Sequence, residues 1–439
     1  MSELKGWRGV SMPWYGELPE RWESVKLRQV LQERKEKNTG IKCSNILSVI
    51  RNRGVILYAD KGNVGNKHSE DIERYNVVHI NDIVMNSMNV IIGSVGRSDY
   101  YGVLSPVYYV LRVMDTERNN VRYLDYIFQM TMLQRDLTKL GNGILAHRMR
   151  IPIDKLKNIE LPLPPRDEQD QIVCYLDWKV SQINMLINAK RRQIALLQEQ
   201  KRALISLQLR GEPVWLKRLI SFPFQYGAND SGVDFSPELP RYVRITDISQ
   251  DGKLKNEGAK SLSREVAEPY ILSDGDILFA RSGATVGKSF LYKSEYGLCA
   301  FAGYLIRAKT DTTRLLPEYL MYVTNSSDYE QWKNSVFILA TIQNISAERY
   351  GQLPVPIPSL AEQQTIVEYL DQQCSRIDKI ISKLNDELAL FAEYRTRLIS
   401  DVVTGKLDVR GVVVPEYEAL EDAADNITED EKPHETEEE

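Results

Sequence analysis

The stretch EQDQIVCYLD at residues 168–177 returns as EQQTIVEYLD at residues 362–371, identical at seven of ten positions, and the fold follows from this repetition. The two copies lie 194 residues apart. The same offset continues without a gap as far as Gly211 in the first copy and Gly405 in the second. A constant offset of this extent indicates a tandem duplication.

The two copies are not equally similar along their length. Residues 164–211 and 358–405 match closely. The stretches before them keep only a skeleton, in which Asp82-Ile83 aligns with Asp276-Ile277. The closely matching segments are therefore expected to have the same function in both copies, while the segments before them have related but different functions.

The closely matching segments are predicted to be long helices. Neither contains Gly or Pro, from 168 to 206 in the first and from 362 to 400 in the second, and proline-rich stretches precede both. Apolar residues recur at heptad spacing, which favours packing of the two helices against each other. The alternative is two unrelated helices, each covering its own domain. The residues expected to pair the helices are Val173, Leu176, Val180, Ile183, Ile187, Ile194, Leu197, Leu204, Val367, Leu370, Ile377, Ile381, Leu388, Phe391 and Leu398.

The less similar stretches are predicted to be mixed α/β modules. Short β-branched and aromatic runs, such as those at 46–50, 107–111 and 276–280, are typical of strands. Helical patterns follow at 122–139 and 317–334. The predicted fold class is therefore α+β, with two α/β domains joined by two long helices.

Composition and charge limit the classes of function. The chain has 439 residues, 43% of them apolar, and we find no apolar run long enough for a membrane span and no signal peptide, so we expect a cytoplasmic protein with no membrane partner. The four cysteines form no CxxC pair and the histidines do not cluster, so no metal site is expected. Residues 416–439 carry a net charge of −11, which leaves +6 on residues 1–415. We expect an acidic, disordered tail and a mildly basic body that permits a polyanionic partner.

One stretch mimics a catalytic motif. Residues 282–289, SGATVGKS, resemble a phosphate-binding loop, but Ser282 replaces the first required glycine. The residues that follow, 290–292, predict a strand rather than the helix whose N-terminus would bind the anion. An ATP-binding enzyme remains an alternative, which a direct test of ATP binding or hydrolysis by the chain would decide. Other catalytic signatures are absent, so no active site is expected in this chain.

A binding surface is the remaining hypothesis. Polar and basic residues gather at predicted turns of both modules, and Arg, Asn and Gln read base edges while Arg and Lys hold phosphates. Each one alone is more often solvated surface. The candidate DNA-binding residues are Arg51, Arg53, Asn86, Ser87, Asn89, Arg97, Arg148, Arg150, Arg244, Arg281, Ser282, Thr285, Lys288, Thr341, Gln343 and Asn344. Whether Arg281 contacts a base or a phosphate is left open.

These patterns resemble a known family. The runs at 242–248 and 275–283, the passage from prolines into Glu-Gln-x-x-Ile-Val at 164–173 and 356–367, and Thr404-Gly405-Lys406-Leu407 resemble the specificity subunits of type I restriction-modification systems. The resemblance covers about residues 14–412 and includes the order variable, conserved, variable, conserved. It implies two target-recognition domains in a pseudo-twofold arrangement, joined by an antiparallel coiled coil.

The resemblance also implies a function without catalysis in this chain. Each domain would read one half of a split, asymmetric site in double-stranded DNA. The helices would dock two methylation subunits, with restriction subunits completing the complex. No cofactor is expected in this chain, while S-adenosylmethionine, ATP and Mg belong to the partner subunits. The alternatives are a specificity subunit of a fused restriction-methylation enzyme and a coiled-coil scaffold without a DNA role.

The expected domain boundaries follow from the repeat and the resemblance. They are a first target-recognition domain at 1–160, a first helical spacer at 161–211, a second target-recognition domain at 212–353, a second helical spacer at 354–412 and an acidic tail at 413–439.

Overall fold

The computed structural model divides the chain into two compact units. Unit 1 comprises residues 1–190 and 386–439, and unit 2 comprises residues 191–385. Unit 1 therefore unites both ends of the chain. The structure describes residues 7–12, 14, 16–50, 54–61, 68–69, 71–88, 93–141, 150–249, 252–283, 285–338 and 344–417.

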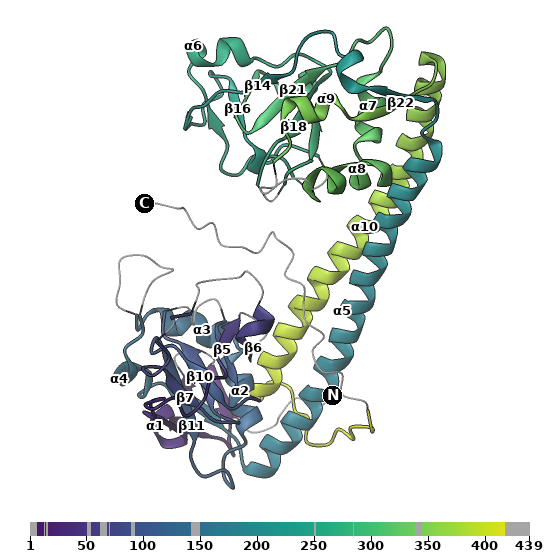
Figure 1. The fold of residues 1–439 in the computed structure, drawn as a ribbon. Helices are drawn as coiled ribbons and strands as arrows, with labels where there is room; N and C mark the ends of the chain where they lie inside the picture. Colours follow the sequence, from purple (N-terminus) through teal and green to yellow (C-terminus); the bar gives the residue numbers. More distant parts are fainter. Residues whose placement is uncertain are drawn as a thin grey trace. The chain divides into compact units, whose positions relative to one another are not determined.

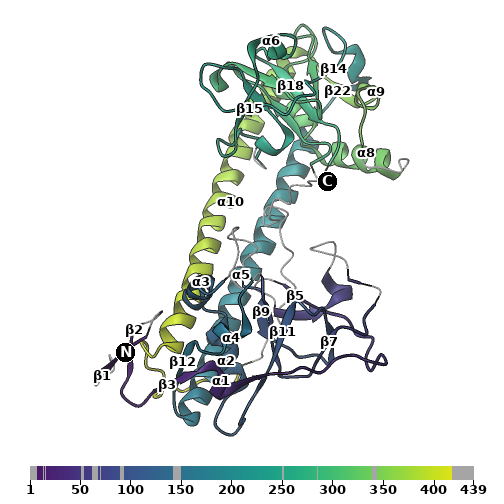
Figure 2. The same cartoon turned by 90° about the vertical axis from the view of Figure 1, so that its left-hand side faces the viewer.

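Two long helices, α5 (Arg166–Gln208) and α10 (Leu360–Val403), lie side by side (Figure 1). Figure 2 shows the same pair from a second direction. Ser359 caps α10, because its Oγ accepts from the Glu362 N–H while the Glu362 carboxylate accepts from the Ser359 N–H. Past the end of α10, Gly405 takes a φ of 72°, which glycine adopts without strain.

The helices pair in antiparallel fashion within each unit. In unit 1, Lys190 Nζ lies 2.5 Å from Glu387 Oε2. In unit 2, Lys201 Nζ lies 2.7 Å from Asp378 Oδ1. A second contact in each unit gives the direction: Arg395 Nη1 donates to Asn184 Oδ1 in unit 1, and Ile205 shares a buried cluster with Leu370 and Cys374 in unit 2. Within each unit, residue numbers therefore rise along α5 as they fall along α10. The packing of the two helices against each other is confirmed. All fifteen residues predicted to pair them are buried or half-buried.

Unit 1 is built on a four-stranded sheet in the order β4-β11-β8-β9, with smaller two-stranded sheets around it. Its strands and short helices are β1 (Trp7–Met12), β2 (Gly16–Pro19), β3 (Glu23–Lys26), α1 (Leu27–Val30), β4 (Leu31–Glu33), β5 (Leu47–Ile50), β6 (Gly54–Leu57), β7 (Asn76–Val78), β8 (Ile83–Asn86), β9 (Val95–Arg97), β10 (Gly102–Leu104), β11 (Tyr108–Val113), α2 (Val121–Phe128), α3 (Thr131–Thr138), α4 (Ile153–Leu156) and β12 (Glu160–Leu163).

Unit 2 contains an equivalent four-stranded sheet in the order β14-β21-β18-β19, and a second sheet in the order β15-β17-β16-β20. Its elements are β13 (Glu212–Trp215), β14 (Gln225–Tyr226), β15 (Val233–Asp234), β16 (Arg241–Val243), β17 (Lys260–Ser261), α6 (Arg264–Ala267), β18 (Asp276–Ala280), β19 (Ser289–Leu291), β20 (Cys299–Phe301), β21 (Leu305–Lys309), α7 (Pro317–Val323), α8 (Ser327–Ile338), α9 (Ala347–Gly351) and β22 (Pro354–Ile357).

The cores explain why each sheet sits on the long helices. In unit 1 the buried cluster joins the sheet and α2 to the last turns of α10, through Val402 and Val403. In unit 2 the sheet and α7 share a buried cluster with the first turns of α10, through Val367. The α+β fold class is confirmed. No helix in the described ranges is long and apolar enough to span a membrane.

The structure corrects one detail of the predicted helices. The helical patterns at 122–139 and 317–334 each form two short helices instead of one. In unit 1 the break comes at Met130, which has an extended backbone with ψ of 121°. In unit 2 it comes at Ser326, whose Oγ donates to the Val323 carbonyl and accepts from the Tyr329 N–H. These local side-chain bonds compete with a continuous helix.

Candidate functional site

Both modules are attached to the long helices by the same contact. Tyr126 Oη donates to Asp177 Oδ1 at 2.6 Å, and Tyr322 Oη donates to Asp371 Oδ1 at 2.5 Å. The two aspartates are equivalent in the repeat. Burial raises the pKa of both tyrosines, so both remain protonated donors at neutral pH. The attachment gives the two sheets equivalent positions on their helices.

Each sheet then presents one hairpin in the same backbone setting. The Ile151 N–H donates to the Ser87 carbonyl at 3.0 Å after β8, and the Ile345 N–H donates to the Arg281 carbonyl at 2.8 Å after β18. Ser87 and Arg281 therefore occupy equivalent positions. Ser87 is buried, with its Oγ donating to the Val107 carbonyl. At this position the two hairpins differ in charge and in exposure.

The hairpin of unit 2, residues 281–288 with residue 284 outside the described part, forms a tight turn between strands. The Ala280 N–H donates to the Lys288 carbonyl and the Gly287 N–H donates to the Ala280 carbonyl. Gly287 has a φ of 86°, and a Cβ there would lie 2.3 Å from Lys333 Cδ. Strand β19 follows the turn, as the sequence predicted, so the described backbone lacks the helix N-terminus of a phosphate-binding loop.

Arg281 stands out at the start of this hairpin. Its N–H donates to the Tyr304 carbonyl at 3.0 Å, so its backbone is fixed on both sides. Its guanidinium carbon lies 5.0 Å from the ring centroid of Tyr226. The buried Nε has no hydrogen-bond partner in the described part of the chain. Such stacking holds the planar guanidinium while leaving its outer N–H groups as donors.

Other arginines of the predicted set are engaged within the protein. Arg244 donates to both carboxylate oxygens of the buried Asp247, at 3.1 and 2.8 Å, and this contact raises the pKa of Arg244. Arg97 donates to Asn81 Oδ1 at 2.8 Å and lies 2.5 Å from Asp99. These two side chains are held by intramolecular partners, which orients them and partly neutralises their charge.

The remaining predicted residues divide into four groups. Asn86 accepts from the Met88 N–H, which places it at the start of the unit 1 hairpin. Arg150 and Asn344 are exposed beside the two hairpins, and Asn344 forms an isolated bridge with Ser282. Thr285 and Lys288 are half-exposed on the unit 2 hairpin. Arg51, Arg53, Asn89, Arg148, Thr341 and Gln343 lie outside the described residues.

Tyr226 was not singled out by the sequence. It lies in β14 and its hydroxyl accepts from the Ala347 N–H at 3.1 Å, so the ring is fixed at both ends. Its contact with Arg281 joins strands that are distant in sequence. A single exposed tyrosine carries no local pattern that would have marked it.

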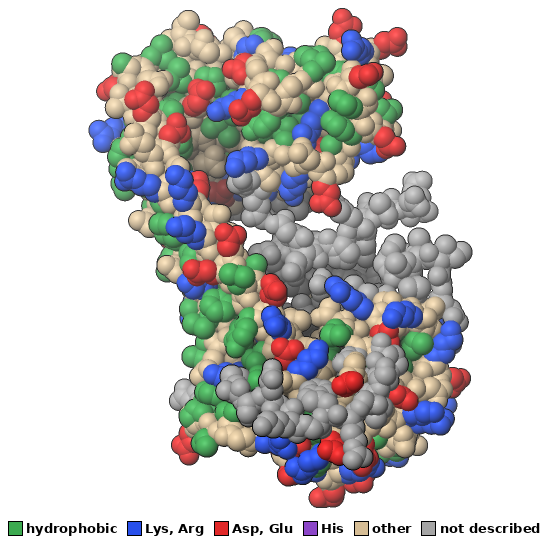
Figure 3. Space-filling view, turned by 180° about the vertical axis from the view of Figure 1, so that it is seen from behind, with side chains coloured by type: hydrophobic (Ala, Val, Ile, Leu, Met, Phe, Trp, Pro, Cys, Tyr) green, Lys and Arg blue, Asp and Glu red, His purple; other side chains and the backbone are tan. Residues whose placement is uncertain are grey.

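Exposed apolar side chains recur on the long helices. Leu196 on α5 and Leu390 on α10 are equivalent in the repeat, and both are 64% exposed. Leu186 and Ile380, also equivalent, are 48% and 45% exposed. Hydrophobic side chains are visible on the long helices in Figure 3, where basic and acidic groups otherwise intermingle over both units.

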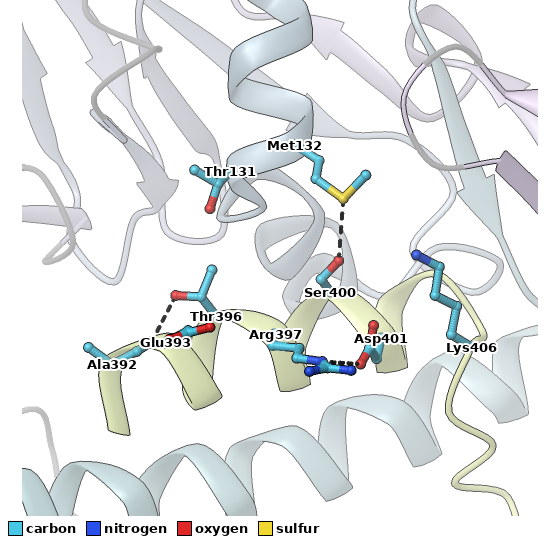
Figure 4. Close-up of a pocket in the computed structure, with 9 residues that line it drawn as sticks. All are labelled: Thr131, Met132, Ala392, Glu393, Thr396, Arg397, Ser400, Asp401 and Lys406. Carbon is cyan, nitrogen blue, oxygen red and sulfur yellow. Dashed lines mark hydrogen bonds and ion pairs between the residues drawn. The ribbon is translucent and has the colours of Figure 1, made fainter. Parts of the chain in front are cut away.

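Unit 1 also has an open recess of about 520 Å³ between the start of α3 and the last turns of α10 (Figure 4). Ser400 Oγ contacts Met132 Sδ across it at 3.8 Å. Its wall carries both signs of charge, including the Arg397–Asp401 pair at 3.5 Å. The recess lies where the module of unit 1 meets α10, and the residues that line it form no cluster of catalytic groups.

The described residues contain no group of three or more His, Cys, Asp or Glu that could hold a metal ion. Two buried acids belong to the structure of the sheets. Asp276 accepts from the Ser273 N–H and lies 3.5 Å from Arg307 Nη1, and burial raises its pKa. Asp125 accepts from the Arg97 N–H, and burial raises its pKa as well.

Comparison with known proteins gives a consistent result. The family model described as the type I restriction modification DNA specificity domain matches residues 19–196 and 241–390. The type I restriction enzyme StySPI specificity subunit of Salmonella potsdam is 29% identical over 169 residues, which are 38% of this chain and 36% of that protein. The EcoKI specificity subunit of Escherichia coli K12 is 29% identical over 173 residues, with the same coverage.

The chain spans about a third of the length of these two curated relatives in the matched regions. A solved structure described as "Structural basis underlying complex assembly and conformational transition of the type I R-M system" has a TM-score of 0.57. It is 16% identical in sequence and covers 89% of this chain and 99% of that one. This likeness concerns the fold.

Proposed function

We propose that this chain is the non-catalytic DNA specificity subunit of a type I restriction-modification complex, because it belongs to the family of the type I restriction modification DNA specificity domain. The observation that carries the proposal is the pair of equivalent sheets, each fixed through a Tyr–Asp bond to a long helix within its own unit. A duplicated recognition module on a shared scaffold suits a DNA target in two halves.

The two halves of the target are proposed to differ. The equivalent hairpin positions hold the buried Ser87 in unit 1 and the half-exposed Arg281 in unit 2. Outside the conserved helices the two modules keep only a skeleton of common sequence, so we propose that their contacts to base edges differ as well. We propose 1–160 and 212–353 as the two target-recognition domains, 161–211 and 354–412 as the helical spacers, and 413–439 as an acidic tail.

The candidate DNA interface is proposed to lie around the two hairpins. In unit 2 it includes Arg281, Ser282, Thr285, Lys288 and Asn344, which the described backbone brings to one end of β18. In unit 1 it includes the exposed Arg150 beside Ser87. Arg97 and Arg244 remain in the proposed set as oriented side chains, each already bound to an acidic neighbour.

Two equal partner sites are proposed on the long helices. The heptad pattern places Leu186 and Leu390 on the same side of the helix pair in unit 1, next to the Lys190–Glu387 ion pair. Leu196 and Ile380 form the equivalent pair in unit 2. Because exposed apolar side chains of equal exposure repeat in both units, two copies of one partner fit them.

These partners are proposed to be two DNA adenine methylation subunits. Restriction subunits complete the complex, which acts in the cytoplasm on double-stranded DNA. S-adenosylmethionine, ATP and Mg serve the partner subunits, and this chain contributes the choice of sequence.

The proposal is tested by expressing the chain with its neighbouring methylation gene in a host free of DNA methylation, and by mapping modified bases with single-molecule sequencing. The expected result is one split motif with a modified adenine on each strand. The methylation subunit expressed alone is the control and should give no motif. A soluble, associated pair that modifies no DNA would count against the proposal.

A further inference from the structure

We propose that the hairpin 281–288 of unit 2 is a clamp for one phosphate of the DNA backbone, with Arg281 as the ligand and Tyr226 as its positioning residue. The inference rests on the proposed DNA-binding function and assigns a specific chemistry to one part of that interface. It also separates two kinds of contact within unit 2, those that bind the DNA backbone and those that read the base sequence.

Four features of the molecule support the clamp, and the first is the unpaired state of the Arg281 side chain within the described residues. Arg244 and Arg307 each lie within 3.5 Å of a buried carboxylate, Asp247 and Asp276 respectively. Arg281 forms no ion pair within the described residues, and its guanidinium has no hydrogen-bond partner there. A half-buried guanidinium without an acceptor has a donor capacity that a ligand can meet.

The second feature is the rigid support of the Arg281 guanidinium. Tyr226 is held through its backbone by β21 and through its hydroxyl by the Ala347 N–H. Arg281 is held through its N–H by Tyr304 and through its carbonyl by Ile345. The stacked guanidinium is therefore fixed before DNA arrives, and little conformational entropy is lost when it binds.

The third feature is the side-chain chemistry of the hairpin. Between 281 and 288 the polar side chains are Arg, Ser, Thr and Lys, and there is no Asn or Gln. Hydroxyls, cations and backbone N–H groups are the usual donors to phosphate, whereas Asn and Gln read adenine. At the tip, Gly283 has a φ of 83° and a Cβ there would meet nothing, so a backbone phosphate can approach closely.

The fourth feature is the difference between Arg281 and the equivalent residue of unit 1. The equivalent Ser87 is 1% exposed and its hydroxyl is bound to the Val107 carbonyl. Nothing at that position can clamp a phosphate in the same way. The clamp is therefore a property of unit 2.

The test uses the full-length chain and three duplexes of unrelated sequence, with binding followed by fluorescence anisotropy over a range of salt concentrations. Arg281→Ala should lower affinity by the same factor on every duplex, roughly three- to tenfold. It should also reduce the magnitude of the slope of log Kobs against log[salt] by about 0.9, the value for one phosphate contact. Arg281→Lys should keep the slope, because the charge remains.

Tyr226 supplies a second, independent variant. Tyr226→Leu removes the ring under the guanidinium and should weaken binding on all duplexes, while Tyr226→Phe keeps the ring and most of the affinity. Arg264→Ala removes an exposed arginine of the same unit and is the matched control, expected to change neither affinity nor slope. Thermal unfolding of each variant separates loss of fold from loss of contact.

The outcomes are distinguishable. In cells, the methylated motif of the Arg281→Ala chain should keep every specified position. A motif that becomes degenerate at one position would make Arg281 a base-reading residue and overturn the clamp, as would unchanged affinity and slope. A wild-type chain that yields no motif and binds no DNA would instead contradict the proposed function itself.

Discussion

Gln169 and Gln363 stand 194 residues apart and make the same hydrogen bonds in the two units. Each side-chain amide nitrogen donates to two backbone carbonyls, at 2.8 and 3.0 Å for Gln169 and at 2.7 and 3.1 Å for Gln363. Each side-chain oxygen accepts from one backbone N–H, at 2.8 Å for Gln169 and at 2.9 Å for Gln363. The backbone partners are Arg118, Asn120 and Pro164 in unit 1, and Arg314, Leu316 and Pro358 in unit 2. The duplicated joint therefore fixes module to helix through buried polar contacts that repeat to within a few tenths of an ångström.

Replacing Gln363 with Leu should destabilise unit 2. The side chain is fully buried, and the substitution leaves two carbonyls and one N–H without their partner, at a cost of roughly 2–4 kcal/mol. Urea unfolding of the full chain measures the loss. Gln364→Leu, at the exposed neighbouring position, should change the unfolding free energy by less than about 0.5 kcal/mol. Equal effects of the two variants would contradict a role for the joint.

The sequence could predict the joint's location because the repeat includes it. The Glu-Gln pair that opens each conserved segment stands at the start of each long helix, after a proline that ends the preceding strand. The apolar contact between the long helices, the α+β class and several strands follow from periodicity of 3.5 or 2 residues. The breaks in the two shorter helical patterns could not be predicted in this way, because they arise from the local backbone at Met130 and the hydroxyl of Ser326.

The site was less predictable, because its geometry is non-local. Arg244 was selected as a DNA contact, and the capping bond to Asp247 three residues later is visible only in the structure. Tyr226 reaches Arg281 from a different strand of the sheet. The composition of a turn indicates which side chains are polar. Which residue each polar side chain contacts within the protein depends on the strands that the fold brings together.

The exposed leucines of the helices should determine partner binding. Leu390→Asp and Leu196→Asp place a charge in the two equivalent apolar sites, and each should reduce the number of bound methylation subunits from two to one. The double variant should bind none. Analytical ultracentrifugation of the purified complex reports the stoichiometry.

Ser382→Asp is the matched control for these changes. It adds the same charge at an exposed position, which the heptad pattern places on the other side of the helix pair. The complex of this variant should keep two partners. Loss of partners from the control as well would mean that charge, and not the leucine site, controls assembly.

The acidic end of the chain should weaken non-specific DNA binding. Residues 418–439 contain eleven acidic residues and one lysine, so a chain ending at Tyr417 changes from a net charge of −5 to +5. Binding of an unrelated duplex should strengthen, and the difference should shrink at high salt because the effect is electrostatic. A difference that persists at 1 M salt would assign the tail a different role.

Two aspartates in one turn should respond to pH in opposite directions. Burial raises the pKa of Asp276, so its folded state favours the proton and its contribution to stability falls as pH rises through that pKa. Bonds from the N–H and hydroxyl of Ser294 lower the pKa of Asp274, so its contribution is lost as pH falls.

Urea unfolding at several pH values between about 2.5 and 7 measures both effects, because the Asp274 contribution is lost below the ordinary carboxyl pKa of 3.8 and the Asp276 contribution changes above it. Relative to wild type, Asp276→Asn should become less costly towards neutral pH, and Asp274→Asn more costly. Parallel pH trends in the two variants would contradict the assignment of opposite shifts.

The most direct test of the central claim is to exchange residues 212–353 for the corresponding region of a family member with a different target, and to map methylation in cells with the native methylation subunit. The methylated motif should be a hybrid in which one half is new and the other half is the original. A motif altered in both halves, or one that keeps both original halves, would contradict the claim that each module reads its own half of the site.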